Sequence, residues 1–118
     1  MMRVLVTGAG GQIGQELVAV FTGAGHDVAP TTSASLDVSD RAAVLEAVQA
    51  LAPEVVVNAA AWTDVDACEE DPQRAERVNG RAVAHVVEAA EKVGAQVLHL
   101  STDYVFDGRK AGAYVEDD

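Results

Sequence analysis

The chain has 118 residues, of which 49% are hydrophobic and 4% aromatic, and its formal net charge at pH 7 is −11. This length suits one domain with a buried core. The negative charge argues against nucleic acid and anionic membrane surfaces as binding partners, and the apolar stretches are too short to span a bilayer.

A single cysteine, Cys68, cannot form an internal disulfide, which favours a reducing compartment. We expect this cysteine to be a small packing residue. No signal peptide is evident, because the first residues lead directly into a short predicted strand. These features together predict a cytoplasmic protein.

The first predicted elements are a strand, Arg3–Thr7, and a helix, Gln12–Thr22, joined by a turn with glycines at positions 8, 11 and 14. Glycine in such a turn adopts backbone conformations that other residues rarely reach and lets the main chain approach a ligand closely. The helix beyond it presents unpaired N–H groups and the positive end of its dipole. The spacing is G-x-x-G-x-x-G, and it predicts a dinucleotide site that holds a pyrophosphate.

The following elements alternate in the same way. Further strands are expected at Asp27–Pro30, Glu54–Asn58 and Gln96–Ser101, and helices at Asp40–Leu51 and from Asp71 to about Val93. Such alternation builds right-handed crossovers and a parallel sheet with helices on both faces. We therefore predict an α/β fold of the doubly wound Rossmann type, with the strand order 3-2-1-4.

Unusual polar and small residues follow three of these strands. They are the glycine turn after the first strand, Asn58–Trp62 after the third and Ser101–Tyr104 after the fourth. The carboxyl ends of parallel strands meet at one edge of a sheet, and ligands bind there where the strand order reverses, here expected between the first and fourth strands. The three patches therefore predict one ligand site.

Three segments carry a resemblance to a known family. Thr7–Gly14, Val57–Asp66 and Ser101–Gly108 resemble, in this order, the dTDP-4-dehydrorhamnose reductases of the extended short-chain dehydrogenase/reductase superfamily. The resemblance covers the whole chain but only the N-terminal part of the family. It implies that residues 1–118 form an NAD(P)-binding Rossmann domain and that the substrate-binding domain lies outside this chain.

The family's Tyr-x-x-x-Lys pair is absent from these residues. The chain has two tyrosines, Tyr104 and Tyr114, and the residues four places further on are Gly108 and Asp118. The pair is therefore expected beyond Asp118.

The implied reaction is the reduction of dTDP-4-dehydro-L-rhamnose to dTDP-L-rhamnose by NADPH or NADH. A tyrosine protonates the developing alkoxide and a serine or threonine hydroxyl orients the carbonyl oxygen. The resemblance assigns that catalytic hydroxyl to Thr102 and substrate contacts to Thr102 and Asp103. Strand alternation indicates that only one of Ser101 and Thr102 faces the pocket; alternatively, both simply end the strand.

The resemblance also implies the residues that bind the cofactor. Glycine-turn residues hold the pyrophosphate, one segment lies beside the adenine, and the exit of the third strand forms a wall along the riboses. These residues are Gly8, Gly11, Gln12, Ile13, Gly14, Asp37, Val38, Ala60, Ala61 and Trp62. A tight strand exit would equally explain the two alanines.

The preference between NADH and NADPH depends on the end of the second strand. A carboxylate there would bind the ribose 2′-hydroxyl and an arginine would favour the 2′-phosphate. The chain has neither, but Thr31, Thr32 and Ser33 supply hydroxyl groups. These favour NADPH, with NADH left open.

Glu16 matches a glutamate that ligates Mg²⁺ at the dimer interface of some family members, which implies Mg²⁺ and a homodimer. One carboxylate is not a metal site by itself, so a solvated helix residue is the competing interpretation. The acidic residues between positions 64 and 71 lack the spacing of a calcium loop and predict a solvated surface with a helix cap.

Two other functions stay open. The nucleotide-sugar epimerases and dehydratases share the glycine motif, although Ser101–Phe106 fits the reductases better. The regulatory subunit of methionine adenosyltransferase also resembles these reductases and uses the fold to bind a partner. A Tyr-x-x-x-Lys pair in the protein would favour an enzyme, and its loss would favour a regulator.

Overall fold

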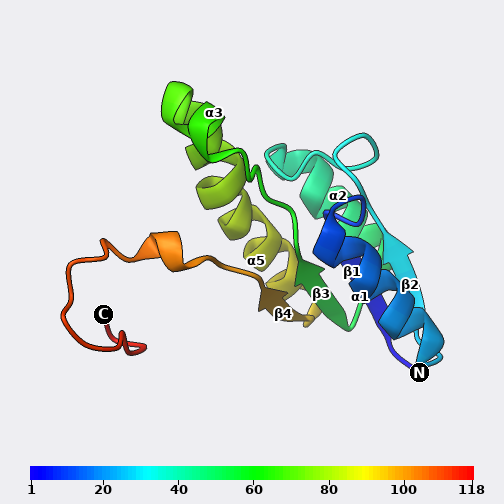
Figure 1. Ribbon diagram of the computed structural model, residues 1–118. Coiled ribbons are helices and arrows are strands. Elements are labelled where there is room, and N and C mark those ends of the chain that lie inside the picture. Colours follow the sequence, from blue (N-terminus) through cyan, green and yellow to red (C-terminus); the bar gives the residue numbers. More distant parts are fainter.

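Four parallel strands form the centre of the computed structural model, which describes all 118 residues (Figure 1). The strands are β1 (Arg3–Thr7), β2 (Asp27–Pro30), β3 (Val55–Asn58) and β4 (Gln96–His99). The main helices are α1 (Gln12–Gly23), α2 (Arg41–Leu51) and α5 (Ala82–Val93). The predicted α/β fold of the Rossmann type is confirmed.

The predicted strand order, 3-2-1-4, is wrong. The order in the sheet is β2-β1-β3-β4, with all neighbours parallel. After β2 the chain returns through α2 past β1 and adds β3 on the opposite side of β1. The reversal therefore lies between β1 and β3, because alternation predicts parallel strands but not the edge that each new strand joins.

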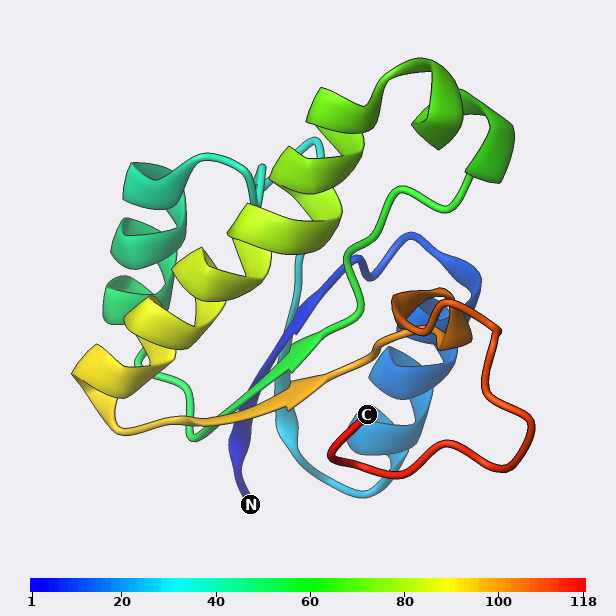
Figure 2. The same ribbon diagram turned by 90° about the vertical axis from the view of Figure 1, so that its left-hand side faces the viewer.

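The sheet has helices on both faces (Figure 2). Helices α2 and α5 cover one face, where Leu5 of β1 and Val56 of β3 are buried together with Val44, Val48 and Val86. Helix α1 covers the other face over Val4, Val6 and Val57. Two apolar layers thus hold the sheet, as a strand pattern with few polar residues predicts.

The helix predicted from Asp71 to Val93 is continuous but not uniform. It consists of α4 (Pro72–Ala75), a π-helical segment η1 (Glu76–Arg81) and α5. The Asp71 carboxylate accepts a hydrogen bond from the Arg74 N–H at 3.0 Å, so the predicted cap is confirmed. A short helix, α3 (Val65–Glu70), was not predicted, and it is capped in the same way by Asp64.

Strand β4 ends at His99, two residues earlier than predicted. Its partner β3 ends at Asn58. Beyond His99, one further backbone hydrogen bond joins this chain segment to β3, from the Leu100 N–H to the Asn58 carbonyl. The chain then forms a single 3-10 turn, η2 (Asp103–Val105), and leaves the sheet (Figure 1). Strand alternation therefore says nothing about how Ser101 and Thr102 are oriented.

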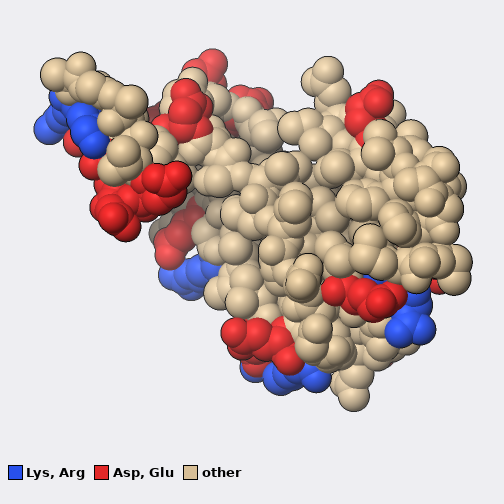
Figure 3. Space-filling view, turned by 90° about the horizontal axis from the view of Figure 1, so that it is seen from below, with Lys and Arg blue, Asp and Glu red and all other residues tan.

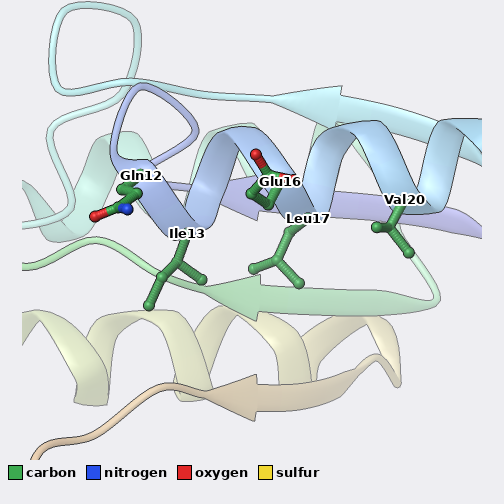
Figure 4. Close-up of a pocket in the computed structure, with 5 residues that line it drawn as sticks. All are labelled: Gln12, Ile13, Glu16, Leu17 and Val20. Atoms are coloured by element: carbon green, nitrogen blue, oxygen red, sulfur yellow. The ribbon is translucent and has the colours of Figure 1, made fainter.

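One side of α1 is open. Ile13 and Val20 are apolar residues of this helix, yet they are 57% and 66% exposed. They project from the same side of the helix as Leu17 and line a groove of about 440 Å³ with Gln12 and Glu16 (Figure 4). Leu17 also packs against the core under α1, so this apolar stripe is only partly covered.

The surface is as acidic as the sequence predicts. On the face seen from below in Figure 3, Lys and Arg form small groups beside acidic side chains and no broad basic patch is visible. None of the helices combines the length and apolar character needed to cross a bilayer.

Candidate functional site

The glycine turn between β1 and α1 is built by very close backbone contacts. Gly8 has φ +67°, and a Cβ on it would lie 2.5 Å from the carbonyl oxygen of Ala59. A Cβ on Gly14 would lie 2.0 Å from the Gly8 carbonyl oxygen. Only glycine fits at these two positions, because a side chain would displace the exits of β1 and β3 or the first turn of α1.

The first turn of α1 leaves its backbone donors free. Gly11 is the N-cap residue and no side chain caps the helix. The N–H groups of Gln12, Ile13 and Gly14 donate to no backbone acceptor, whereas the Gly11 N–H is bonded to the Gly8 carbonyl at 3.0 Å. Free N–H groups at the positive end of a 12-residue helix form a favourable place for an anion such as a pyrophosphate.

The exit of β2 lies directly against this turn. The Ala9 N–H donates to the Thr31 carbonyl at 2.9 Å, and a Cβ on Gly10 would lie 3.4 Å from the Thr32 methyl group. The Thr31 hydroxyl is already used, since it donates to the Val6 carbonyl at 3.2 Å. The exposed Thr32 and Ser33 are therefore the residues that can offer hydroxyl groups to a ligand.

Asp37 and Val38 occupy the loop that follows. The Asp37 carboxylate accepts hydrogen bonds from the Ser39 N–H and hydroxyl at 2.9 and 2.7 Å. These bonds hold the pKa of this exposed carboxyl below its ordinary value, so it stays negative at neutral pH. The Val38 side chain is buried in the core, so only the backbone of this residue could contact a ligand.

The exit of β3 brings Ala59–Trp62 to the same edge. Ala59 and Ala60 touch the glycine turn through their backbone, while the Ala60 side chain packs against the core. Ala61 is exposed and Trp62 half-buried. A cofactor would therefore meet the backbone of Ala60, and packing explains why its side chain is small.

Asn79, a residue to which the sequence pattern gives no role, holds Trp62 in place. Asn79 accepts a hydrogen bond from the Trp62 N–H at 2.8 Å and donates one to the Trp62 carbonyl at 2.9 Å. The Arg74 guanidinium lies 4.0 Å from the centre of the Trp62 ring, and the Cys68 thiol 3.5 Å from its carbonyl. Asn79 belongs to the π-helical segment, a distortion that is frequent at functional sites.

Thr102 and Asp103 follow β4 at the same edge but bond only within their own turn. The Thr102 hydroxyl donates to the Asp103 carboxylate at 3.1 Å and accepts from the Tyr104 N–H at 3.3 Å. Both residues are exposed, and Ser101 makes no side-chain hydrogen bond in the structure. The roles of Thr102 and Asp103 toward a substrate stay predictions.

Glu16 has no second metal ligand beside it in this structure, so a magnesium site there stays a prediction. Glu16 shares the groove on α1 with one amide and three apolar side chains. No group of three or more His, Cys, Asp or Glu side chains in the structure is arranged so that it could hold a metal ion. Hard cations require several oxygen ligands, so Glu16 here has the surroundings of a solvated helix residue.

Comparison with known proteins identifies relatives of this chain. Residues 2–118 match the family described as RmlD substrate binding domain. A dTDP-4-dehydrorhamnose reductase from Streptomyces griseus is 47% identical over 98% of this chain and 38% of its own length. The solved structure of a dTDP-4-dehydrorhamnose reductase from Clostridium acetobutylicum superimposes with a TM-score of 0.93 at 39% identity, over 99% of this chain and 42% of that one.

A third relative was solved with a cofactor. The structure of dTDP-4-dehydrorhamnose reductase from Bacillus anthracis in complex with NADP has a TM-score of 0.88 and 34% identity, covering 93% of this chain and 40% of that chain. The chain thus spans about 40% of the length of the relatives that it matches.

Proposed function

The chain belongs to the family described as RmlD substrate binding domain, and on this premise we propose that the protein carrying it reduces dTDP-4-dehydro-L-rhamnose to dTDP-L-rhamnose with a nicotinamide cofactor. Residues 1–118 would be its NAD(P)-binding domain. The free N–H groups of Gln12, Ile13 and Gly14, in a turn that only glycine can close, carry this proposal. The 47% identity to the Streptomyces griseus reductase, over 98% of this chain, supports it.

The chemistry divides between the cofactor and this chain. When bound, the reduced cofactor would supply a hydride to the C4 carbonyl carbon of the sugar. The Thr102 hydroxyl would donate a hydrogen bond to the carbonyl oxygen as negative charge develops on it. The proton for that oxygen would come from a tyrosine outside these residues, so this chain alone binds and orients but does not complete the reaction.

We propose NADPH as the preferred cofactor. The Thr32 and Ser33 side chains are exposed beside the glycine turn and could bind a 2′-phosphate, and no carboxylate stands at the end of β2 to repel it. The NADP complex of the Bacillus anthracis reductase supports this choice. We also place the protein in the cytoplasm, consistent with its single, half-buried cysteine. The homodimer that the resemblance implies stays a proposal as well.

Binding of ADP-ribose, the half of the cofactor that would lie on the glycine turn, tests the proposal. A leucine at Gly11 would stand at the N-cap and block approach to the free N–H groups, whereas a leucine at Gly23, in open space at the other end of α1, would not. By calorimetry we expect binding by the wild-type protein and Gly23→Leu and none by Gly11→Leu. Equal binding by all three proteins would place the cofactor elsewhere.

Turnover distinguishes the reductase from the other functions. We expect the complete protein to oxidise NADPH when dTDP-4-dehydrorhamnose is added. The decrease in NADPH absorbance measures this reaction. Cofactor binding without oxidation of NADPH would indicate an epimerase or a partner-binding regulator instead.

A further inference from the structure

Three polar side chains form a hydrogen-bonded row across the sheet, at the strand ends next to the glycine turn. Thr7, Asn58 and His99 are the last residues of β1, β3 and β4, and the register pairs them side by side. The Thr7 hydroxyl donates to the Asn58 Oδ1 atom at 2.5 Å. The Asn58 Nδ2 atom lies 3.2 Å from His99 Nδ1. Thr7 is 1% exposed and Asn58 2% exposed.

With the Asn58 amide oriented as in the structure, its Oδ1 atom toward Thr7 and its Nδ2 atom toward His99, the donors and acceptors of the row follow. Because Asn58 Oδ1 accepts from Thr7, the Asn58 amide group that faces His99 is the NH₂ donor. His99 Nδ1 must then be an unprotonated acceptor, so in the neutral ring the proton is on Nε2. His99 is the exposed end of the row, and without its acceptor the Asn58 N–H would lose its only protein partner and the amide would no longer have a fixed orientation.

The row lies where the two strand exits touch. The residues that follow Thr7 and Asn58 are Gly8 and Ala59, whose backbones are in direct contact, and the Ala59 N–H donates to the Thr7 carbonyl at 3.3 Å. A change in the Asn58 side chain would therefore be transmitted to the spacing of β1 and β3 at the glycine turn.

We propose that His99 is a positioning residue for the cofactor: by accepting a hydrogen bond from Asn58, it fixes the amide that ties β3 to Thr7 and so keeps the glycine turn in the shape that binds the pyrophosphate. This inference rests on the proposed function, because it concerns the affinity of the same cofactor site. His99 itself need not touch the cofactor.

A matched pair of variants tests the role of the acceptor. In His99→Asn an amide oxygen can take the place of Nδ1, whereas His99→Leu has nearly the same shape without an acceptor. We expect the Kd for NADPH, measured by fluorescence titration at a temperature where both variants are folded, to rise about tenfold in His99→Leu and to stay close to the wild-type value in His99→Asn.

A measurement on the wild-type protein tests the same inference without relying on a variant. Nitrogen-15 NMR of the imidazole distinguishes the two neutral tautomers, and we expect His99 to be protonated on Nε2 and unprotonated on Nδ1. A proton on Nδ1, or an unchanged Kd in His99→Leu, would overturn the role of His99 and leave the proposed function standing. Failure of the wild-type protein to bind NADPH or NADH would overturn both.

Discussion

Gly14 lies so close to Gly8 that a Cβ on Gly14 would stand 2.0 Å from the Gly8 carbonyl oxygen. The contact joins the first turn of α1 to the end of β1, and it fixes where the free N–H groups of the helix point. Backbone forms both sides of this contact, so no rotamer change can relieve a clash there.

Gly14→Ala is therefore expected to lower the stability of the fold by about 1–3 kcal/mol, as overpacking does in closely packed sites. Gly23→Ala, on the same helix with no atom within 4 Å of the added Cβ, provides the control. Its stability should be unchanged or higher by up to about 1 kcal/mol, because alanine favours a helix more than glycine does. Urea denaturation of both variants measures the difference, and equal midpoints would mean that the contact can relax.

Thr32→Asp is expected to shift cofactor preference toward NADH. A carboxylate at this exposed position would repel a 2′-phosphate and could accept a hydrogen bond from a ribose 2′-hydroxyl. We expect the ratio of Kd values for NADPH and NADH to rise about tenfold, a change that corresponds to about 1.4 kcal/mol.

The neighbouring threonine should behave differently. The Thr31 hydroxyl donates to the Val6 carbonyl, so an aspartate at position 31 would set a carboxylate against that oxygen and should impair folding. Thr22→Asp, at the exposed far end of α1, controls for the added charge. An unchanged NADPH-to-NADH ratio in Thr32→Asp would show that the ribose lies elsewhere.

An ion pair between α2 and α5 predicts a pH dependence of stability. Glu88 accepts hydrogen bonds from two nitrogens of Arg41, at 2.8 and 2.5 Å, and lies 3.3 Å from the Lys92 ammonium. The hydrogen bond from Arg41 is the main cause that lowers the pKa of Glu88. A carboxyl whose pKa is lower in the folded state stabilises the fold above its unfolded pKa, about 4.3 for glutamate, and that stability is lost as pH falls through the folded value.

Glu88→Gln should accordingly lower the Tm at pH 7, and the gap from the wild-type protein should close in acid. Glu91→Gln, an exposed change on the same helix without an ion pair, should leave Tm nearly unchanged. Thermal melts of both variants, monitored by circular dichroism between pH 3 and pH 7, measure the Tm values. This pH range lies roughly on both sides of the ordinary glutamate pKa. A gap that widened in acid would contradict the assignment.

The parts of the fold that the sequence predicts are those set by local chemistry. Glycine spacing identifies the turn at Gly8 because the need for a positive φ and for close contact is a property of that residue alone. The cap at Asp71 follows from the same logic. Strand order is different, because both edges of a strand offer the same backbone hydrogen-bonding groups and the alternation of strands and helices does not indicate which edge of the sheet β3 joins.

In the candidate site too, features set by the local sequence could be predicted and those set by long-range contacts could not. The segments after β1, β3 and β4 could be predicted from their position in the alternation, but Asn79 could not. It lies in a predicted helix, 17 residues from Trp62, and its role depends on a π-helical distortion that apolar spacing does not reveal. The sequence likewise does not indicate a role for His99, since its partner Asn58 is 41 residues away in the chain.

Thr102 provides the test of the proposed chemistry. Its hydroxyl donates to Asp103 in the structure, so it must turn from that carboxylate to the sugar carbonyl to act on a substrate. In the complete enzyme, Thr102→Val should lower kcat on the order of 10²–10³-fold, the usual effect of removing one donor to a developing oxyanion. The Kd for NADPH should not change, because the glycine turn is untouched.

Two further variants distinguish the effect of the Thr102 hydroxyl from the effects of its methyl group and of the Ser101 hydroxyl. Thr102→Ser keeps the hydroxyl and should retain most of the activity, while Ser101→Ala removes a neighbouring hydroxyl that makes no hydrogen bond and should cost far less than Thr102→Val. Steady-state kinetics with dTDP-4-dehydrorhamnose and NADPH compares all three. A larger loss in Ser101→Ala would transfer the role to Ser101, and a Thr102→Ser enzyme as inactive as Thr102→Val would show that the methyl group matters rather than the hydrogen bond. Because the strand ends at His99, backbone geometry favours neither residue, and the kinetics decide between them.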